Sequence, residues 1–368
     1  MKRLTGRGAE FCSVIKGNAY GHGIETFVPL AESCGVRRFA VFSSGEAFRA
    51  HESFTADSTV MIMGEMGDDA VEWAVEKGVS FYVFDEERLL SAIAAASKVG
   101  RRARIHLELE TGLNRTGFDQ AELSQALELI ASAPGALTIE GVCTHYAGAE
   151  SSANFLRIAQ QRAQFESMVS SLRRAKVEFA LCHTACSAAA INLPETAMDL
   201  VRFGIAQYGY WPSQETYMRW AVGREQTGSR SSKDPLRRVI RFESRVMALK
   251  RVKRGEFVGY GNVYLTPRSQ VLAAVPVGYF HGFARSLSNL GHVLIHGRRA
   301  PVVGLVNMNM MMVDVTDLRG VEKGDEVVII GKQGRAQISI GSFSDLTRYL
   351  NYEVLIRLPG ELPRVIVD

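Results

Sequence analysis

Eight short apolar runs alternate with longer amphipathic segments along roughly the first 210 residues, and this alternation limits the folds open to the chain. Short continuous apolar runs are typical of buried strands, whereas Ala121–Ala133 and Asn154–Ala175 repeat apolar residues at the helical period. Strands that alternate with helices imply parallel strands joined by crossovers, so eight such units predict a closed (β/α)8 barrel. The predicted strands are Phe11–Ile15, Phe39–Phe42, Val60–Met63, Phe81–Phe84, Ile105–Leu109, Ile139–Cys143, Phe179–Cys182 and Leu200–Ile205.

An open, doubly wound parallel sheet is the alternative architecture with the same alternation of strands and helices. That fold commonly binds a nucleotide through a Gly-x-Gly-x-x-Gly turn after its first strand. No such motif follows an early strand of this chain, so the closed barrel is the favoured interpretation.

The alternation stops at Ser213–Arg238. Within this stretch, a polar run over 223–235 with two Gly, three Ser and one Pro predicts a linker or exposed loop. Beyond it, short runs rich in Val and Ile are separated by Gly, Pro, Asn and Asp, which is typical of an all-β domain. We therefore expect a barrel domain over 1–235 and a β-domain over 236–368. The predicted strands of the β-domain are Arg241–Leu249, Val271–Val277, His292–Ile295, Val302–Val306, Met311–Val315 and Glu326–Ile330.

The composition is that of an ordinary globular protein, with 46% hydrophobic and 22% charged residues among 368. A net charge of +4 without a long basic run indicates no nucleic-acid partner. No apolar stretch is long enough to span a membrane or to act as a signal peptide, so we expect a cytoplasmic protein. Five scattered cysteines predict buried free thiols, and the half-motif at Cys182–Cys186 has no second Cys/His pair with which to bind zinc.

Lys16 ends an apolar run and enters a turn bounded by glycines, with the hydroxyl of Tyr20 four residues later. A lysine at the end of a buried strand is costly unless its charge is paired or neutralised. Desolvation lowers the pKa of the ammonium group and exposes a nucleophilic amine, which covalent attachment of pyridoxal phosphate (PLP) requires. On residue type alone, a lysine that extends its side chain to the surface is the commoner interpretation.

Polar residues at the carboxyl ends of barrel strands are the reactive residues of this fold. An amine, hydroxyl groups and backbone donors gathered there suit an anionic, electrophilic cofactor. Taken singly, Arg115 is as readily a surface ion-pair arginine, and His145 a hydrogen-bonded core histidine. The residues that follow the predicted strands in this way are Lys16, Tyr20, Arg115, His145, Ser187 and Arg202.

The run Val-Ile-Lys-Gly-Asn-Ala-Tyr-Gly-His-Gly at 14–23 closely resembles the PLP-attachment signature of the alanine racemases, Val-Val-Lys-Ala-Asn-Ala-Tyr-Gly-His-Gly. The similarity extends over nearly the whole chain and reaches into the predicted β-domain. It therefore implies a PLP-dependent enzyme built from a barrel and a C-terminal β-domain. The other segments that are similar to family signatures are 109–117, 141–145, 183–187, 201–209, 256–261, 276–279, 300–308 and 351–354.

The resemblance implies a role for each matching residue. Lys16 would attach PLP, and Arg202 would face the pyridine nitrogen with His145 behind it. Arg115 would reach the phenolate side of the cofactor and the carboxylate of the substrate. The residues implied for phosphate binding are Tyr20, Ser187, Gly204, Ile205 and Tyr352.

The family mechanism implies two acid/base groups, Lys16 and Tyr260, on opposite faces of the substrate Cα. In the family, the residues corresponding to Tyr260 and Met308 come from the partner subunit, which implies a homodimer with shared active sites. The implied reaction interconverts L-alanine and D-alanine and supplies D-alanine for peptidoglycan. From residue chemistry alone, Tyr260 is more readily a packed strand tyrosine.

Three other functions are compatible with such a site. A racemase of serine or other small amino acids is one. A PLP-dependent amino-acid decarboxylase of the same barrel fold is another, although its usual lysine signature and glycine-rich phosphate loop are missing here. A non-enzymatic PLP-carrier barrel is the third, and the extra 240–368 segment argues against it because such carriers are single barrels.

The chain departs from the family pattern at several positions. Only fifteen residues precede Lys16, so we expect the barrel to lack the strand and helix that usually come first. Glu108 stands where many relatives carry a carbamylated lysine, and its carboxylate would hold Arg115 without bicarbonate. The residues that replace Ala-Asp, Cys and Asp near the substrate entrance, and so affect substrate range, are Phe280, His281, Asn307 and Asn309.

Overall fold

Eight parallel strands form one sheet in the order β7-β6-β5-β4-β3-β2-β1-β8. Backbone pairing between Cys186 and Arg202 brings the segment after β7 beside β8, so the sheet curls into a nearly closed barrel. The predicted (β/α)8-type barrel is thereby confirmed. The strands are β1 Glu10–Val14, β2 Arg38–Val41, β3 Thr59–Ile62, β4 Ser80–Val83, β5 Ala103–Glu108, β6 Leu137–Cys143, β7 Leu181–His183 and β8 Leu200–Phe203.

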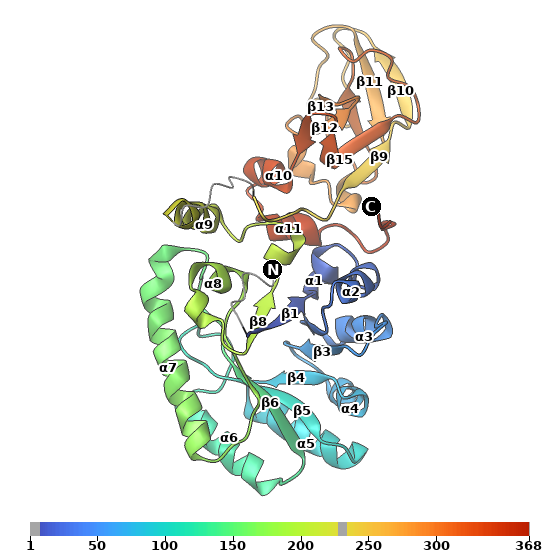
Figure 1. Ribbon diagram of the computed structural model, residues 1–368. Coiled ribbons are helices and arrows are strands. Elements are labelled where there is room, and N and C mark those ends of the chain that lie inside the picture. The colour runs from blue at the N-terminus through green and yellow to red at the C-terminus, as the bar shows by residue number, and fades with distance from the viewer. Residues whose placement is uncertain (1–7, 227–233, 368) are drawn as a thin grey trace. The chain divides into compact units, whose positions relative to one another are not determined.

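This computed structural model describes residues 8–226 and 234–367, which separate into two units. The first unit holds the barrel and runs to Ala19 and then from Ile24 to Arg237. The second unit holds the β-rich part from Arg238 onward, and it also takes in the short segment Tyr20–Gly23. Figure 1 shows the barrel in blue to green and the β-rich part in yellow to red.

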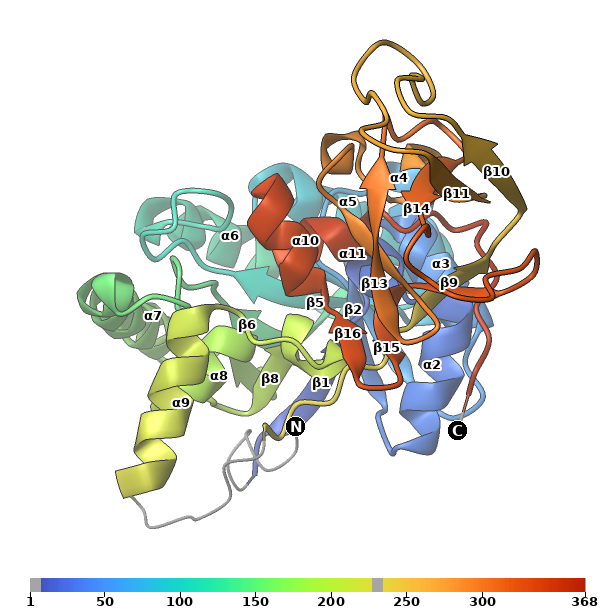
Figure 2. The same cartoon turned by 90° about the horizontal axis from the view of Figure 1, so that it is seen from above.

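Helices of the first unit lie on the outside of its strands, as Figures 1 and 2 show for α2 to α7. Their ends carry the expected signals: Ser43 and Asp119 cap α3 and α6 in capping boxes, while left-handed Gly78 and Gly100 end α4 and α5. The helices are α1 Lys16–Tyr20, α2 Ile24–Ser33, α3 Ser44–Glu52, α4 Asp68–Lys77, α5 Glu86–Val99, α6 Gln120–Ser132, α7 Phe155–Arg174, α8 Ser187–Asn192 and α9 Gln214–Gln226, with short 3-10 turns η1 Ser152–Asn154, η2 Pro194–Thr196 and η3 Ile205–Tyr208.

The predicted linker over 223–235 is wrong for its first four residues, which belong to helix α9, Gln214–Gln226. The Ser213 hydroxyl accepts a hydrogen bond from the Thr216 amide at 3.0 Å, so it caps the first turn. The rings of Trp211 and Trp220 pack with centroids 5.1 Å apart. These contacts compensate for the weak apolar pattern of α9, which concealed the helix in the sequence. Residues 227–233 of the predicted linker lie outside the described residues.

The second unit is an antiparallel sheet in the order β10-β11-β14-β13-β12-β15-β16, with β9 paired to β15. The all-β prediction is confirmed for this sheet, which is followed by two short helices near the end of the chain. Its elements are β9 Phe242–Arg245, β10 Ala248–Val252, β11 Gln270–Val275, β12 His292–Ile295, β13 Arg298–Val303, β14 Met311–Asp314, β15 Glu326–Gln333, β16 Ala336–Ile338, α10 Ile340–Thr347 and α11 Asn351–Ile356, with 3-10 turns η4 Tyr279–His281 and η5 Arg285–Leu287.

A chain of polar groups crosses the apolar interior of the barrel. His183 Nδ1 lies against the guanidinium of Arg202, and His183 Nε2 lies 2.9 Å from His106 Nδ1. His106 Nε2 then lies 3.5 Å from a carboxylate oxygen of Glu140. Because a guanidinium only donates hydrogen bonds, we assign a proton to Nε2 of each histidine and a one-way chain from Arg202 to Glu140.

His183 and His106, the two histidines of this hydrogen-bonded series, are neutral. Burial lowers the pKa of His183 well below its usual range, and the Arg202 charge lowers it further. Burial also lowers the pKa of His106, although Glu140 opposes that shift. Burial favours the neutral form of Glu140, but hydrogen bonds from His106 and Arg104 outweigh it and lower the Glu140 pKa to about 2.

The barrel should lose stability as the pH falls below 6.5, because unfolded His183 would bind a proton there that the native protein does not bind. Between pH 7.5 and pH 5.5 proton uptake by unfolded His183 lowers the free energy of unfolding by about 1.4 kcal/mol. His183→Gln has no titrating group, so its loss over that interval should be smaller by about this amount. Urea unfolding of both proteins at the two pH values measures the difference, and equal losses would contradict the assignment of a neutral His183.

Gly21 has no room for a side chain. A Cβ at this position would lie 2.0 Å from the Leu355 carbonyl oxygen, and the Gly21 φ of +78° is itself unfavourable for other residues. We expect Gly21→Ala to reduce stability by about 2–4 kcal/mol. Gly223→Ala is the matched control, because Gly223 lies within α9 with no atom in the way and should gain about 0.5–1 kcal/mol. A Gly21→Ala protein that melts at the same temperature as the wild type would contradict the close contact between Gly21 and the Leu355 carbonyl oxygen.

Candidate active site

Lys16 begins a left-handed turn directly after β1. Gly17, Asn18 and Ala19 have φ values of 63°, 54° and 53°, and Tyr20 follows at 49°. A left-handed helical conformation costs about 1–2 kcal/mol for each residue that carries a Cβ, so the turn is strained. It persists because it is tied down, in part by the Ala19 amide, which donates to the Ile15 carbonyl oxygen at 2.7 Å. The chain thus presents Lys16 at the carboxyl end of the barrel.

The Lys16 amine is solvent-accessible but its pKa is lowered. Partial dehydration by the surrounding protein is the largest cause, and the positive charge of Arg115 adds to it. Arg202 acts in the same direction, whereas the negative charge of Glu46 opposes the shift. A lowered pKa raises the fraction of neutral, nucleophilic amine at a given pH.

Arg115 stands on a loop that Glu110 organises. The Glu110 carboxylate accepts backbone hydrogen bonds from Gly112, from Asn114 at 2.9 Å and from Arg115 at 3.3 Å. Burial opposes ionisation of Glu110, but these donors outweigh it, and the Glu110 pKa is lowered. The Arg115 side chain itself is 59% exposed. The loop is therefore fixed while the guanidinium remains available to an anionic ligand.

Glu108 lies beneath Arg115 with only 5% of its side chain exposed. One of its carboxylate oxygens is 3.9 Å from an Arg115 nitrogen, and the other accepts a hydrogen bond from the Thr116 hydroxyl at 2.9 Å. Burial raises the pKa of Glu108, while Thr116 and Arg115 counteract part of that shift. Glu108 thus places an acidic group next to Arg115.

Arg202, on β8, is buried and its guanidinium is held by backbone carbonyls. It donates to the carbonyl oxygens of His183 at 2.9 Å, Thr144 at 2.8 Å and Thr184 at 3.1 Å. These acceptors lie at the ends of β6 and β7, so three strands fix the direction of the guanidinium. Two or more good acceptors are what a buried cation needs to remain charged in place.

His145 follows β6 and lies beside the same guanidinium, with Nδ1 3.5 Å from Arg202 Nη2. Burial lowers the pKa of His145 to about 3, and the charges of Arg202, Arg115 and Lys16 contribute. The imidazole is therefore neutral near pH 7. The loop that carries it is held by Gln161, whose side chain donates to the His145 carbonyl oxygen at 3.1 Å.

Donors for an anion lie at the ends of β7 and β8. The buried Ser187 hydroxyl accepts a hydrogen bond from the Gly204 amide at 3.0 Å, which places Ser187 and Gly204 side by side. Ile205 begins the 3-10 turn η3, where the first backbone amides have no partner inside the turn. These groups resemble the amide and hydroxyl donors with which proteins bind phosphates.

In the second unit, Tyr20 packs against Tyr352 of α11 with ring centroids 6.0 Å apart. Gly21 keeps this segment close to α11, and its carbonyl oxygen accepts from Arg364 at 2.8 Å. The structure thus brings together the two tyrosines that were predicted to bind phosphate.

Tyr260 is 71% exposed at the tip of the loop between the paired residues Phe257 and Leu265. It stands between Gly259 and Gly261, both at positive φ, so the turn projects the ring outward. Met308 is 54% exposed in the same unit. Neither residue is packed in a barrel wall, contrary to the commoner interpretation of a strand tyrosine.

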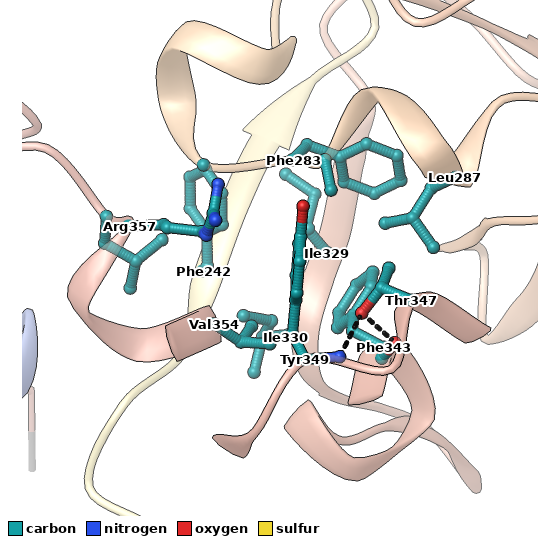
Figure 3. Close-up of a pocket in the computed structure, with 13 residues that line it drawn as sticks. Phe242, Phe283, Leu287, Ile329, Ile330, Phe343, Thr347, Tyr349, Val354 and Arg357 are labelled. Atoms are coloured by element: carbon teal, nitrogen blue, oxygen red, sulfur yellow. Dashed lines mark hydrogen bonds between the residues drawn. The ribbon is translucent and has the colours of Figure 1, made fainter. Parts of the chain in front are cut away.

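The pocket drawn in Figure 3 lies within the β-rich unit, and none of the predicted site residues lines it. Its lining is mainly apolar and aromatic, and Arg357 stacks on the Tyr349 ring at 4.3 Å from the centroid. The dashed bonds join the Thr347 hydroxyl to the Phe343 carbonyl and to the Tyr349 amide. These contacts serve helix packing, so we do not assign a ligand to this pocket.

No helix within residues 8–226 and 234–367 is long and apolar enough to cross a bilayer. The same described residues contain no group of three or more His, Cys, Asp or Glu side chains placed to hold a metal ion. Cys182 is buried, and burial raises the pKa of its thiol.

The sequence interpretation overlooked the residues that orient the site. Glu46 and Glu110 bind backbone amides around Lys16 and Arg115, and His183 lies against Arg202. The pattern Ser43-x-x-Glu46 is a recognisable capping box and marks the start of α3. It does not reveal that the same carboxylate also reaches Gly17, which lies 29 residues earlier in the chain.

Comparison with known proteins agrees with this architecture. Residues 1–212 match the family model described as alanine racemase, N-terminal domain, and residues 239–366 match alanine racemase, C-terminal domain. Alanine racemase 1 of Caldanaerobacter subterraneus subsp. tengcongensis is 34% identical over 366 residues, which cover 99% of this chain and 90% of the relative.

Solved structures show the same likeness. The alanine racemase of D-cycloserine-producing Streptomyces lavendulae superposes with a TM-score of 0.88 at 30% identity, covering 100% of this chain and 92% of the other. The Bacillus anthracis alanine racemase with bound L-Ala-P gives a TM-score of 0.86 at 28% identity, with 97% and 90% covered. Matches of both family models, together with these full-length relatives, place this chain in the alanine racemase family.

Proposed function

We propose that this protein is a PLP-dependent racemase that interconverts L-alanine and D-alanine and so supplies D-alanine for peptidoglycan. Membership of the alanine racemase family, whose enzymes are PLP-dependent isomerases, supports this reaction class. The single observation that carries the proposal is the position and state of Lys16, an accessible amine with a lowered pKa at the carboxyl end of β1. The predicted cytoplasmic location stays a prediction.

The donor set of the first unit fits PLP. PLP needs an amine to attach its aldehyde carbon, donors for a phosphate and a partner for its ring nitrogen. Lys16 offers the amine, and the Ser187 hydroxyl and the Ile205 amide offer donors. The Gly204 amide, which donates to the Ser187 oxygen in this structure, would be shared with the phosphate. Tyr20 and Tyr352 supply two further hydroxyl groups in the second unit. We assign these residues to the cofactor, with Arg202 opposite the pyridine nitrogen.

When bound, PLP would withdraw electron density from the substrate Cα, which makes its proton removable. Arg202 keeps its own protons because a guanidinium stays charged, so it would hold the ring nitrogen by a hydrogen bond without protonating it. Its three backbone carbonyl partners prevent it from turning away. Neutral His145 would add no second charge beside it.

Arg115 would bind the carboxylate of the amino acid. Its exposed guanidinium stands on a loop tied by Glu110, and a fixed arginine is suited to hold a carboxylate in one orientation. Glu108 would limit the movement of Arg115 in the place where relatives use a carbamylated lysine. This arrangement requires no bicarbonate.

Racemisation requires proton removal from one face of Cα and proton return on the other. Lys16 Nζ would serve one face and Tyr260 Oη the other. The exposure of Tyr260 and Met308 supports a role for both after association with a second copy of the chain. Exposed apolar neighbours of Tyr260, namely Phe257, Val263 and Leu265, support the same interface. The proposed assembly is a two-fold homodimer in which each active site draws residues from both chains.

Borohydride reduction should fix PLP to Lys16. Peptide mass mapping of the reduced protein should find the pyridoxyl label on the peptide that contains Lys16, because that amine is the accessible nucleophile of the site. Lys16→Ala should lose the label and racemisation of L-alanine, while Lys98→Ala, on the exposed surface, should keep both. Label on another lysine would overturn the assignment of Lys16. Faster loss of optical rotation with L-serine than with L-alanine would show that serine, not alanine, is the preferred substrate.

Tyr260→Phe should reduce racemisation about a hundredfold or more, because a positioned general acid or base contributes at least that much. Tyr264→Phe is the matched control on the same loop, because the Tyr264 hydroxyl donates to the Gln270 side chain at 3.2 Å and is assigned no part in the reaction. Activity of Tyr260→Phe close to that of Tyr264→Phe would exclude Tyr260 as an acid/base group.

Mixing Lys16→Ala with Tyr260→Phe chains tests whether the two groups come from different subunits. If they do, each mixed dimer has one site with both groups and one with neither, and regains about half of wild-type activity. If each site is built within one chain, mixing restores nothing, once mass spectrometry has shown that mixed dimers formed.

A further inference from the structure

Helix α3 sends two side chains to the turn that follows Lys16. Glu46 and Arg49 lie three residues apart on this helix and therefore on one face of it. Arg49 donates to the Asn18 side-chain oxygen at 2.6 Å, and that oxygen also accepts from the Ile24 amide at 3.2 Å. Glu25 in turn holds Arg49 through two hydrogen bonds of 2.6 and 2.8 Å. The far end of the turn is thus fixed.

Glu46 holds the near end of the turn. One of its carboxylate oxygens accepts from the Gly17 amide at 2.6 Å and the Asn18 amide at 3.2 Å. The other accepts from the amides of Phe42 at 3.1 Å and Ser43 at 3.3 Å, where α3 begins. A single carboxylate therefore joins the end of β1 to the end of β2 through four backbone amides.

The turn needs such an anchor because its conformation is unfavourable. Consecutive left-handed residues point their backbone N–H groups in one direction. The first of these N–H groups have no acceptor within the turn and need one from outside it. An ionised carboxylate is a stronger acceptor than water or a neutral side chain. Since Gly17 is bonded directly after Lys16, the direction of its amide also determines where the Lys16 side chain leaves the backbone.

We propose that Glu46 is a positioning residue that holds the left-handed turn and thereby directs the Lys16 amine for cofactor attachment and proton transfer. This inference rests on the proposed function, in which Lys16 is the PLP lysine. Glu46 does not touch the reacting atoms; it acts through the backbone of Gly17 and Asn18. Without it, the turn relaxes toward ordinary backbone conformations, and the amine moves away from its working position.

Glu46→Ala should lower kcat between about ten- and a hundredfold, since a misplacement near 1 Å at a reacting group has effects of that size. KM for alanine should change little, because Arg115 and its loop are untouched. The fraction of protein that borohydride labels at Lys16 should fall as well, and the visible absorbance of bound PLP should fall with it. Glu46→Gln is the second variant, to be used if Glu46→Ala does not fold. It keeps the side-chain volume and one acceptor oxygen, so it should show a smaller loss of kcat and of labelling.

Two control variants separate positioning from helix stability. Ser43→Ala removes the hydroxyl that accepts from the Glu46 amide, so it weakens the start of α3 but leaves the bonds to Gly17 and Asn18. It should lower the melting temperature yet retain kcat and the label on Lys16. Glu52→Ala removes a carboxylate from the exposed end of the same helix and should change none of these quantities.

The outcomes are distinct. A kcat and labelling defect in Glu46→Ala that Ser43→Ala lacks supports the proposal. Wild-type kcat and labelling in both Glu46 variants, or equal defects in Glu46→Ala and Ser43→Ala, overturn the positioning role while the proposed function stands. A wild-type protein without label on Lys16 overturns the proposed function and this inference with it.

Discussion

A buried guanidinium at the carboxyl end of the barrel governs the arrangement of the residues around it. Burying the Arg202 charge is costly, and carbonyl oxygens of Thr144, His183 and Thr184 offset that cost. These acceptors come from the ends of two neighbouring strands, so the requirement for acceptors ties three strand ends together. The same charge helps to keep His145 and His183 neutral. One cation therefore fixes the geometry of its surroundings and adds to the effect of burial on the protonation of two histidines.

Carboxylates also organise the site, because they bind backbone amides rather than the side-chain cations of Lys16 and Arg115. Glu46 binds the amides of the two residues after Lys16, and Glu110 binds the amides of Asn114 and Arg115. Lys16 and Arg115 consequently keep their charged ends available, since the acids that lie near them are occupied elsewhere. Glu108 lies close to the Arg115 guanidinium, and burial raises the pKa of Glu108. The carboxylates that fix the backbone are thus different groups from the side chains proposed to act on the substrate.

The barrel strands follow from the sequence because each contains a short, mainly apolar segment, and recognising such a segment requires no knowledge of its neighbours. That the candidate site residues gather at the strand ends was also predictable, since the fold brings those ends together. Two features were not. Helix α9 has a weak apolar pattern and depends on packing of Trp211 with Trp220. The role of Glu46 depends on contact with Gly17, and a capping box within α3 carries no information about that distant partner.

The composition of the turn after Lys16 follows from its conformation. Gly17 adopts a φ of 63° without a steric penalty, where the resembling signature carries alanine. Asn18 is among the residues that tolerate the left-handed region best, and its side chain bonds Ile24 and Arg49. Ala19 and Tyr20 carry a Cβ in the same left-handed region, so their strain falls on the bonds that fix the turn. Glycine at position 17 therefore lowers the backbone strain in the half of the turn that Glu46 binds. The direction of the Lys16 side chain then depends on the charge and length of the Glu46 side chain rather than on strain at Gly17.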